Sequence, residues 1–312
     1  MDFAGRLAVV TGGGSGMGRE LVVQLAARGC DVATCDVNDA ELAETVKLAS
    51  DGAPEAHVTG HLCDIADESQ VGRFRDEVLV RHGRDHVNLL FNNAGIGGGY
   101  SFIAEDRAVW DRTFAICWGG VYNCSRAFVP LIIASDAGYI VNTSSVNGFW
   151  AALGPTWPNS AYSTAKFAVK GFSESLITDL RVNAPHVKVA VVMPGHIGTG
   201  IVENSWRILA NDGSEPTTGD APGQDPENLV QQTAEAFRAS APVSASEAAT
   251  VILDAVHNDA WRILVGDDAR ALDDAVRSDP LAVYGRDGLE VSSLGAGPAT
   301  ESGTQVDAAR TD

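Results

Sequence analysis

The sequence has few cysteines, and their positions exclude several kinds of site. The five thiols stand far apart and form no CxxC pair: Cys30, Cys35, Cys63, Cys117 and Cys124. An odd, scattered set predicts neither a disulfide framework nor a zinc site. The sequence also lacks an HExxH motif and any carboxylate cluster with metal-ligand spacing, so we expect no metal. Reduced thiols fit a cytoplasmic protein.

Long apolar runs and basic residues are also scarce. No segment approaches roughly eighteen uninterrupted apolar residues, and the start, MDFAGRLAVVTGGG, has no basic region ahead of a long apolar one. This pattern predicts neither a membrane span nor an export signal. Only 22 Lys and Arg stand against 41 Asp and Glu, which gives a formal net charge of -19. Such a chain repels nucleic acid and anionic membranes, and no local basic cluster offsets the repulsion.

Short β-branched runs are what the sequence has in quantity. Each is too short for a helix and too continuous for a half-exposed strand, which is typical of strands buried on both faces. The runs alternate with helical stretches, so we predict an α/β chain: a single-domain, doubly wound Rossmann fold with a parallel seven-stranded sheet flanked by helices. The runs are RLAVVTG, DVATCD, EAHVTGHLCD, VNLLFNNAG, GYIVNTSS, VKVAVVMPG and WRILVGDD. The helices are expected at roughly 16–28, 39–50, 67–82, 106–135, 160–183 and 246–258.

Two segments depart from this alternation. Near 200–245, a polar Gly- and Pro-rich stretch precedes the helical pattern NLVQQTAEAFRAS, which predicts a substrate lid inserted in the Rossmann-fold domain 1–270. The C-terminal tail, 271–312, is expected to be partly disordered because it is small, polar and aperiodic from Gly285 onward.

A glycine-rich turn joins the first expected strand to the first helix. VVTGGGSGMGRE sets Thr11, Gly12, Gly16 and Gly18 in the spacing TGxxxGxG. Ligands bind at this edge of doubly wound sheets, where helix amides and the helix dipole meet a phosphate. The turn therefore predicts a nucleotide cofactor, and the alternative is a turn that binds nothing.

The second expected strand ends at Asp36, where a carboxylate can accept hydrogen bonds from both ribose hydroxyls of an adenosine. Its charge would repel a 2′-phosphate. Ser15 and Val37 occupy places where a phosphate-binding enzyme would use a cation, so the sequence favours NAD over NADP. Arg19 is a nearby cation, and its charge opposes the inference of NAD. The alternative interpretation of Asp36 is a solvated carboxylate at the end of a strand, with no ligand.

With NNAG at 92–95 and YSTAK at 162–166, the sequence resembles the short-chain dehydrogenase/reductase family. The resemblance covers roughly residues 5–266 and includes NTSS at 142–145 and PGHIGT at 194–199. It implies a nicotinamide-dependent alcohol dehydrogenase or ketone reductase with Ser145, Tyr162 and Lys166 at the reacting carbon. It also implies a homotetramer or homodimer.

The same resemblance implies a cofactor site. Asp64 would meet the adenine, and Ile197 and Thr199 would hold the carboxamide. The full set is Gly12, Ser15, Gly16, Met17, Gly18, Asp36, Val37, Asp64, Ile65, Asn93, Ala94, Gly95, Tyr162, Lys166, Pro194, Gly195, Ile197 and Thr199.

Tyr162 and Lys166 are four residues apart and share one face of the expected helix. An unperturbed phenol has a pKa of about 10 and is protonated near neutrality. A nearby ammonium group and the positive nicotinamide ring would favour phenolate, which makes Tyr162 a usable general base. Ser145 would hydrogen-bond the substrate oxygen, and Ser144 is its rival.

The chain departs from the family at Cys117, where many relatives carry an Asn. A thiol is a weak donor and acceptor and does not reproduce an amide that holds a water against the lysine. Three interpretations compete. In the first, a nearby group such as Asn147 or backbone carbonyls holds that water. In the second, the enzyme is slower. In the third, the protein binds NAD without turnover. Buried thiols are usually inert packing, which argues against a regulatory Cys117.

Aromatic residues follow Ser145 and recur in the lid. We expect an apolar pocket for a hydrophobic secondary alcohol or ketone, with the alternative that these residues pack the loop or an interface. The pocket candidates are Trp150, Trp157, His196 and Trp206. Two other functions remain open: a noncatalytic NAD-binding redox sensor and a nucleotide-sugar epimerase or dehydratase.

Overall fold

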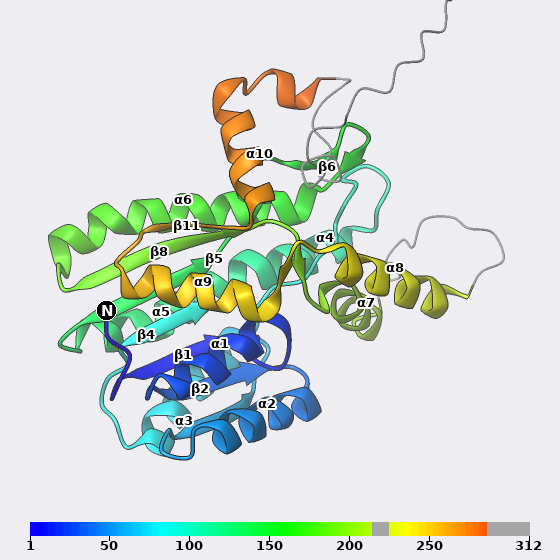
Figure 1. Cartoon of the computed structure of the whole chain (residues 1–312). Helices are drawn as coiled ribbons and strands as arrows, with labels where there is room; N and C mark the ends of the chain where they lie inside the picture. The colour runs from blue at the N-terminus through cyan, green and yellow to red at the C-terminus, as the bar shows by residue number, and fades with distance from the viewer. Residues whose placement is uncertain (214–224, 286–312) are drawn as a thin grey trace, which may run out of the picture.

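A parallel seven-stranded sheet forms the centre of the computed structural model, which describes residues 1–213 and 225–285. The strand order is β11-β8-β5-β4-β1-β2-β3 (Figure 1). Every neighbouring pair is parallel, which confirms the predicted fold. The strands are β1 (Leu7–Thr11), β2 (Asp31–Asp36), β3 (Val58–Leu62), β4 (Leu89–Asn92), β5 (Gly138–Thr143), β8 (Val187–Pro194) and β11 (Arg262–Val265).

Helices cover both faces of this sheet. On one face α1 (Gly16–Ala27), α2 (Asp39–Gly52) and α9 (Ala245–His257) enclose a core with Ala8 and Val10. On the other, Leu7 and Val9 join a core with α3 (Glu68–His82), α5 (Gly120–Ile133) and α6 (Ser160–Asn183). Successive residues of β1 thus enter opposite cores, which explains why the strand sequences are continuously apolar.

The helix before β5 is long, apolar and interrupted by a π turn. It runs through α4 (Arg107–Phe114), the π turn Ala115–Gly119 and α5. By length and hydropathy alone Arg107–Ile133 is a candidate membrane span. However, Val109, Cys117 and Phe128 on this helix are fully buried against the sheet. The segment is therefore a core helix of the fold.

Two helices occupy the 200–245 insertion. These are α7 (Ile201–Asn211) and α8 (Pro226–Ser240), and the second corresponds to the helical pattern seen in the sequence. A short parallel pair, β9 (Ile197–Gly198) with β10 (Val243–Ser244), closes the insertion at its base. The middle of the predicted polar loop, 214–224, lies outside the described residues.

The boundary predicted at residue 270 falls inside α10 (Asp267–Ser278). This helix projects from the sheet layer beside the antiparallel hairpin of β6 (Ala152–Gly154) and β7 (Trp157–Pro158) (Figure 1). Its Leu272 packs with Trp150 and Val283 in a third apolar cluster. The fold thus continues past 270, and the part of the tail expected to be disordered, from 286 on, lies outside the described residues.

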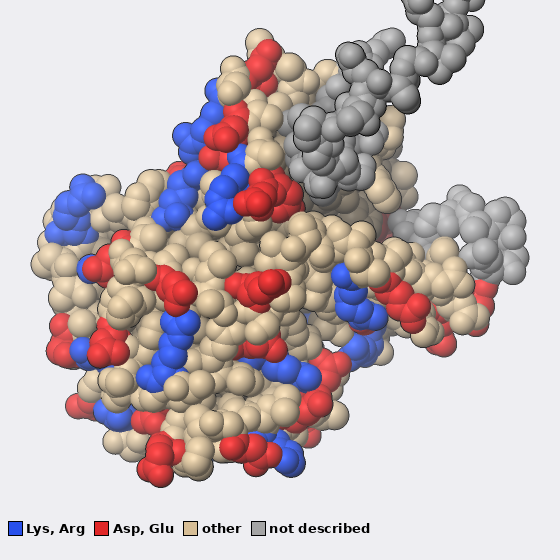
Figure 2. All heavy atoms as spheres, in the orientation of Figure 1, with Lys and Arg blue, Asp and Glu red and all other residues tan. Residues whose placement is uncertain are grey.

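Basic and acidic side chains are interspersed on the face shown in Figure 2, which presents no large basic tract. Several arginines pair with acids across elements. Arg28 lies 2.8 Å from Asp254, and Arg262 lies 2.6 Å from Asp273. Paired charges of this kind leave little free positive potential for a polyanion.

Candidate active site

The site lies where the strand order reverses, at the carboxyl ends of β1 and β4. The Thr11 hydroxyl accepts hydrogen bonds from the backbone amides of Asn93 (3.0 Å) and Ala94 (3.1 Å). The Asn93 amide group also donates to Thr11 O at 3.1 Å. These bonds join the loops after the two strands into one crevice, the position at which open α/β sheets bind ligands.

The glycine turn requires glycine at two points. Gly12 has φ of +69°, which disfavours a side chain. A Cβ on Gly18 would lie 2.0 Å from Gly12 O, so only glycine lets the start of α1 approach the turn this closely. The backbone is thus exposed to a ligand at the first turn of a twelve-residue helix, as phosphate binding demands. The residues present fit a dinucleotide.

Asp36 closes the adenosine end of this crevice. Its Oδ2 accepts the Gly14 amide at 2.9 Å, and its Oδ1 accepts the Asn38 amide at 3.0 Å. The Asn38 side chain in turn caps α2 by accepting from Glu41 N. The carboxylate is therefore held at the strand end by the turn and by the next helix, which the solvated alternative did not predict.

Arg19, the cation that opposed NAD, is engaged by the glycine turn and by α2. Its guanidinium donates to Gly14 O at 2.6 Å and to Thr45 Oγ1 at 3.0 Å. It also pairs with Glu44 at 2.9 Å. Its charge is thus balanced within the first two helices.

Other predicted cofactor positions follow β2, β3 and β8 at the same edge of the sheet. A Cβ on Gly16 would lie 3.3 Å from the Thr199 side chain, which brings the loop after β8 to the glycine turn. Asp64 follows β3, and its Oδ2 pairs with Arg112 at 2.7 Å. The adjoining Ile65 is buried under Gly120. Val37 is exposed beside Asp36.

Ser145, Tyr162 and Lys166 converge from β5 and α6. Lys166 is buried, donates from Nζ to Thr143 O at 2.8 Å, and lies 5.5 Å from the centre of the Tyr162 ring. Ser144, the rival serine, donates to Lys166 O at 2.7 Å and is thereby committed to anchoring α6. Ser145 Oγ accepts the backbone amide of Asn147 at 3.1 Å, and its hydroxyl makes the side-chain hydrogen bond to Tyr162 that lowers the phenol's pKa.

Burial dominates the electrostatics of this group. It raises the pKa of the Tyr162 phenol, assisted by Cys117 and Tyr100 and opposed by the hydroxyl of Ser145. It also lowers the pKa of Lys166. In the absence of cofactor the phenol is therefore neutral, and Lys166 alone does not produce the phenolate expected from the sequence.

Cys117 lies in the π turn, and its thiol donates to Ile96 O at 3.1 Å. A Cβ on Gly95 would lie 3.4 Å from Lys166 Nζ and 3.6 Å from Cys117 Sγ, so both groups border the same backbone. Burial raises the thiol's pKa, which argues against a reactive cysteine. The side-chain NH2 of Asn147 donates to Trp150 O (3.0 Å) and Ala152 O (2.8 Å). Lys166 Nζ itself donates to a backbone carbonyl, that of Thr143.

Cys117→Ala should destabilise the fold by about 1–3 kcal/mol, because Ile96 O loses its donor in a buried site. Cys117→Ser keeps a donor of similar size and should stay closer to wild type. Urea unfolding measures the difference. Equal free energies of unfolding for wild type, Cys117→Ala and Cys117→Ser would show that the thiol hydrogen bond does not stabilise the fold.

The predicted pocket residues separate into three environments. Trp150 is fully buried beneath α10 and donates to Val283 O, so it packs the loop, as the alternative predicted, and does not wall an open pocket. Trp157 is 65% exposed at the tip of the hairpin. The His196 ring packs 4.2 Å from that of Phe237, and its Nε2 pairs with Phe237 O, which ties it to α8. Trp206 is half-buried on α7.

Three features of the site were missed at the sequence level. Asp268 accepts the His196 amide at 2.7 Å and supports the turn after β8. Asn204 on α7 donates to Ser15 Oγ at 2.9 Å and closes the lid helix on the glycine turn. Tyr100 lies in the irregular loop after β4, near Tyr162. Isolated polar residues carry no periodic signal, so only the fold brings them together.

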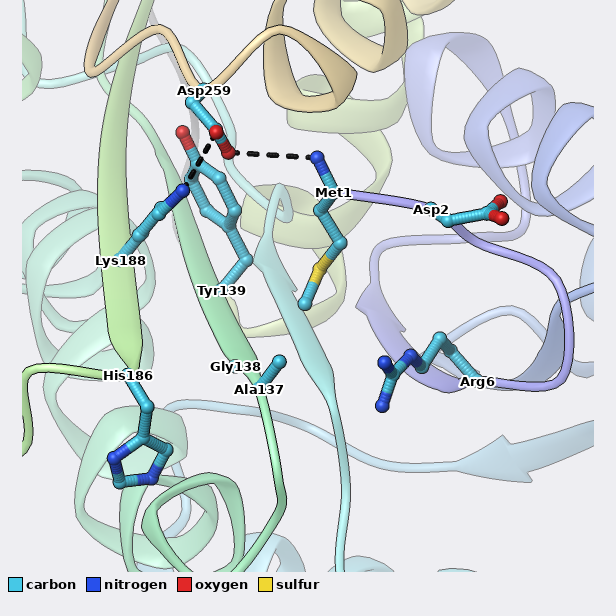
Figure 3. Close-up of a pocket in the computed structure, with 9 residues that line it drawn as sticks. All are labelled: Met1, Asp2, Arg6, Ala137, Gly138, Tyr139, His186, Lys188 and Asp259. Atoms are coloured by element: carbon cyan, nitrogen blue, oxygen red, sulfur yellow. Dashed lines mark hydrogen bonds and ion pairs between the residues drawn. The ribbon is translucent and has the colours of Figure 1, made fainter.

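A separate pocket of about 180 Å³ lies at the opposite edge of the sheet (Figure 3). Lys188 and the Met1 amine both pair with Asp259 there, at 2.7 and 3.5 Å. The Tyr139 hydroxyl donates to Ala260 O. These groups satisfy one another at the amino ends of β5 and β8, away from the crevice. Among the described residues, no cluster of His, Cys, Asp or Glu could hold a metal ion.

Comparisons with known proteins agree with this geometry. Residues 6–208 match the short chain dehydrogenase family. The chain is 37% identical over 274 residues to the Mycobacterium tuberculosis oxidoreductase SadH, covering 87% of this chain and 90% of that protein. It is 32% identical over 211 residues to levodione reductase of Leifsonia aquatica, covering 66% and 75%. A solved short-chain dehydrogenase/reductase from Burkholderia phymatum, in complex with NAD, superposes with a TM-score of 0.73 at 29% identity, covering 89% and 92%.

Proposed function

Because this chain belongs to the short-chain dehydrogenase/reductase family of oxidoreductases, we propose that it interconverts a hydrophobic secondary alcohol and its ketone with NAD(H). The observation that carries the proposal is the convergence of Ser145, Tyr162 and Lys166 beside the glycine turn. A hydroxyl, a phenol and an ammonium group meet where the crevice accepts a dinucleotide. Levodione reductase, a relative, is named for a carbonyl reduction.

Each of the three residues has a separate role. The Ser145 hydroxyl donates to the substrate oxygen and stabilises charge that develops on it. Tyr162 exchanges a proton with that oxygen, as acid in ketone reduction and as base in alcohol oxidation. Lys166, anchored on Thr143 O, places its positive charge against the Tyr162 ring and stabilises the phenolate. The bound nicotinamide supplies or accepts the hydride.

The neutral phenol of the cofactor-free site suits reduction. Since burial raises the Tyr162 pKa, the proton needed by a developing alkoxide is already in place near neutral pH. Oxidation requires that this proton first be lost. The same residues therefore serve both directions, with opposite dependence on pH.

The proposed preference for NAD is supported by the charges at the adenosine end. Asp36 is fixed by two amide hydrogen bonds, while Arg19 is paired with Glu44. A 2′-phosphate would meet an uncompensated carboxylate. The free, buried state of all five cysteines supports a cytoplasmic location, and the exposed Ile133 and Phe167 on α5 and α6 support a homotetramer or homodimer through those helices.

Asp36→Ala should lower the ratio of kcat/KM with NAD to kcat/KM with NADP by roughly 10- to 100-fold, which is the range for losing hydrogen bonds to a charged group. The removed charge also ends the repulsion of a 2′-phosphate. Steady-state assays with both cofactors measure the ratio. Asp36→Asn, which keeps one amide-accepting oxygen, separates the effect of charge from loosening of the turn. An unchanged ratio in both variants would contradict the assignment.

The leading alternative is a noncatalytic NAD-binding redox sensor. The raised pKa and full burial of Cys117 oppose a sensing thiol, and the complete Ser145, Tyr162, Lys166 group opposes loss of catalysis. A nucleotide-sugar epimerase is opposed by the TGxxxGxG spacing of the glycine turn, because that family normally has a different glycine spacing. Incubation with NAD and a panel of hydrophobic secondary alcohols, followed by the absorbance of reduced nicotinamide, decides between enzyme and sensor. Tight NAD binding without turnover across the panel would favour the sensor.

A further inference from the structure

Tyr100 is a second phenol near the site, and the proposed reaction does not use it. Its backbone carbonyl accepts a hydrogen bond from Ser160 N at 2.9 Å, and Gly99 O accepts one from Ala161 N at 2.9 Å. These bonds fix the loop after β4 against the first turn of α6. That turn also carries Tyr162, so the two phenols are attached to adjoining backbone.

The Tyr100 hydroxyl lies beside the backbone that follows β4. A Cβ on Gly97 would lie 3.7 Å from the Tyr100 hydroxyl, and one on Gly95 would lie 3.4 Å from Lys166 Nζ. The Tyr100 hydroxyl and the Lys166 ammonium therefore border the same strip of backbone after β4. The two phenols are also close enough that Tyr100 contributes to the raised pKa of Tyr162, after burial and Cys117.

Glu105 holds the loop from its other end. Its Oε2 accepts the Ser101 amide at 3.3 Å. Burial raises the pKa of Glu105, and the neighbouring amides lower it. Burial is the larger cause that raises the pKa of Tyr100, and the charge of the Glu105 carboxylate raises this pKa further. Tyr100 thus remains a neutral phenol that can donate a hydrogen bond.

Other polar side chains around the mouth are already engaged. Ser205 Oγ donates to Ile201 O and accepts from Gly97 N at 2.8 Å. His196 pairs with Phe237 O, and Asn204 with Ser15. Within residues 1–213 and 225–285 no protein group hydrogen-bonds the Tyr100 hydroxyl, and the residue is 37% exposed. The free donor is thus available to a ligand.

We propose that Tyr100 determines substrate specificity by donating a hydrogen bond to a second oxygen of the substrate, while Ser145 and Tyr162 hold the reacting oxygen. The substrate class is then a diketone or hydroxyketone, or the corresponding diol, on an apolar skeleton. A site built to bind a polar group discriminates against analogues that lack it, because its own donor is left unpaired. This inference rests on the proposed oxidoreductase function and narrows it.

The test compares wild type with Tyr100→Phe on cyclohexanone and on the 1,2-, 1,3- and 1,4-cyclohexanediones, with NADH in excess. The substitution should lower kcat/KM for at least one dione by about 3- to 10-fold, the loss expected for one neutral hydrogen bond. Cyclohexanone should be unaffected. Tyr122→Phe, which removes an exposed phenol on α5, is the matched control and should change neither.

Each outcome is decisive. Equal effects of Tyr100→Phe on diones and cyclohexanone, or no effect on either, would overturn the role of Tyr100 while leaving the oxidoreductase intact. Turnover of cyclohexanone without turnover of any dione would do the same. If wild type binds NADH but reduces none of the four ketones or a wider panel of hydrophobic ketones, the proposed function itself fails.

Discussion

Tyr162→Phe should lower kcat by about 10²- to 10⁴-fold in both directions, the usual contribution of a positioned acid or base. The phenol is hydrogen-bonded by Ser145 and is backed by the Lys166 ammonium. Phenylalanine keeps the ring that packs in the second core but removes the exchangeable proton. Cofactor affinity should stay within about threefold, since loss of a single neutral hydrogen bond costs little.

Two measurements test this expectation. Steady-state turnover gives kcat, and quenching or enhancement of NADH fluorescence on titration gives the cofactor Kd. Tyr122→Phe serves again as a phenol removed outside the crevice. A Tyr162→Phe enzyme that turns over at the wild-type rate would exclude the proton-transfer role, whereas lost NADH binding would instead indicate a damaged fold.

The second large effect is on pH dependence, and its sign follows from the raised pKa of Tyr162. Oxidation needs the phenolate, the minor form at neutral pH, so its kcat/KM should rise roughly tenfold per pH unit from about pH 6 to 8. Reduction uses the neutral phenol, so its rate should be flat over the same range and fall only at higher pH. Lys166→Met, which removes the adjacent charge, should move the rise in oxidation to higher pH.

Profiles of kcat/KM in both directions, at constant ionic strength, measure this effect. The Ser145→Ala enzyme should be slower in both directions but keep the same direction of pH dependence, because Tyr162 still carries the proton. Oxidation that is independent of pH across this range would mean that the phenol does not limit proton transfer.

Much of the fold was predictable because the local sequence pattern of each element agrees with the way that element packs in the fold. Leu7–Thr11 is apolar throughout, since alternate residues enter two cores, and such a pattern has few structural alternatives. Gly12 and Gly18 marked the cofactor crevice because their backbone positions tolerate no side chain. In each case the physical constraint is visible within about ten residues, the scale on which periodicity and turn chemistry act.

The parts that sequence did not predict depend on distant contacts. Trp150 resembles a pocket aromatic until α10 is placed over it, more than a hundred residues later in the chain. No helix was predicted at 267–278, and the boundary at 270 cut through α10, because Asp and Arg interrupt its apolar positions. Tyr100 lies in a loop without periodicity, and its relation to Tyr162 exists only through pairing with the start of α6.

Cys117 is a second example of a contact that the sequence alone did not predict. The sequence made the proton relay uncertain, because a thiol cannot replace an amide that holds water. The structure gives the thiol a different partner, Ile96 O, and gives Lys166 the carbonyl of Thr143. The lysine is thus anchored by backbone, which side-chain identity alone does not reveal.

The central claim is that Tyr162 is a buried phenol whose proton becomes mobile when oxidised cofactor adds positive charge to the crevice. Ultraviolet difference titration of wild type against Tyr162→Phe observes this phenol directly, with and without NAD⁺. Without cofactor its phenolate should appear only above the ordinary range of about 10. Saturating NAD⁺ should lower the pH at which half of the Tyr162 phenol is ionised. NADH, whose ring is neutral, should leave that pH unchanged. A phenol that titrates normally in the free protein, or that ignores NAD⁺, would contradict the account.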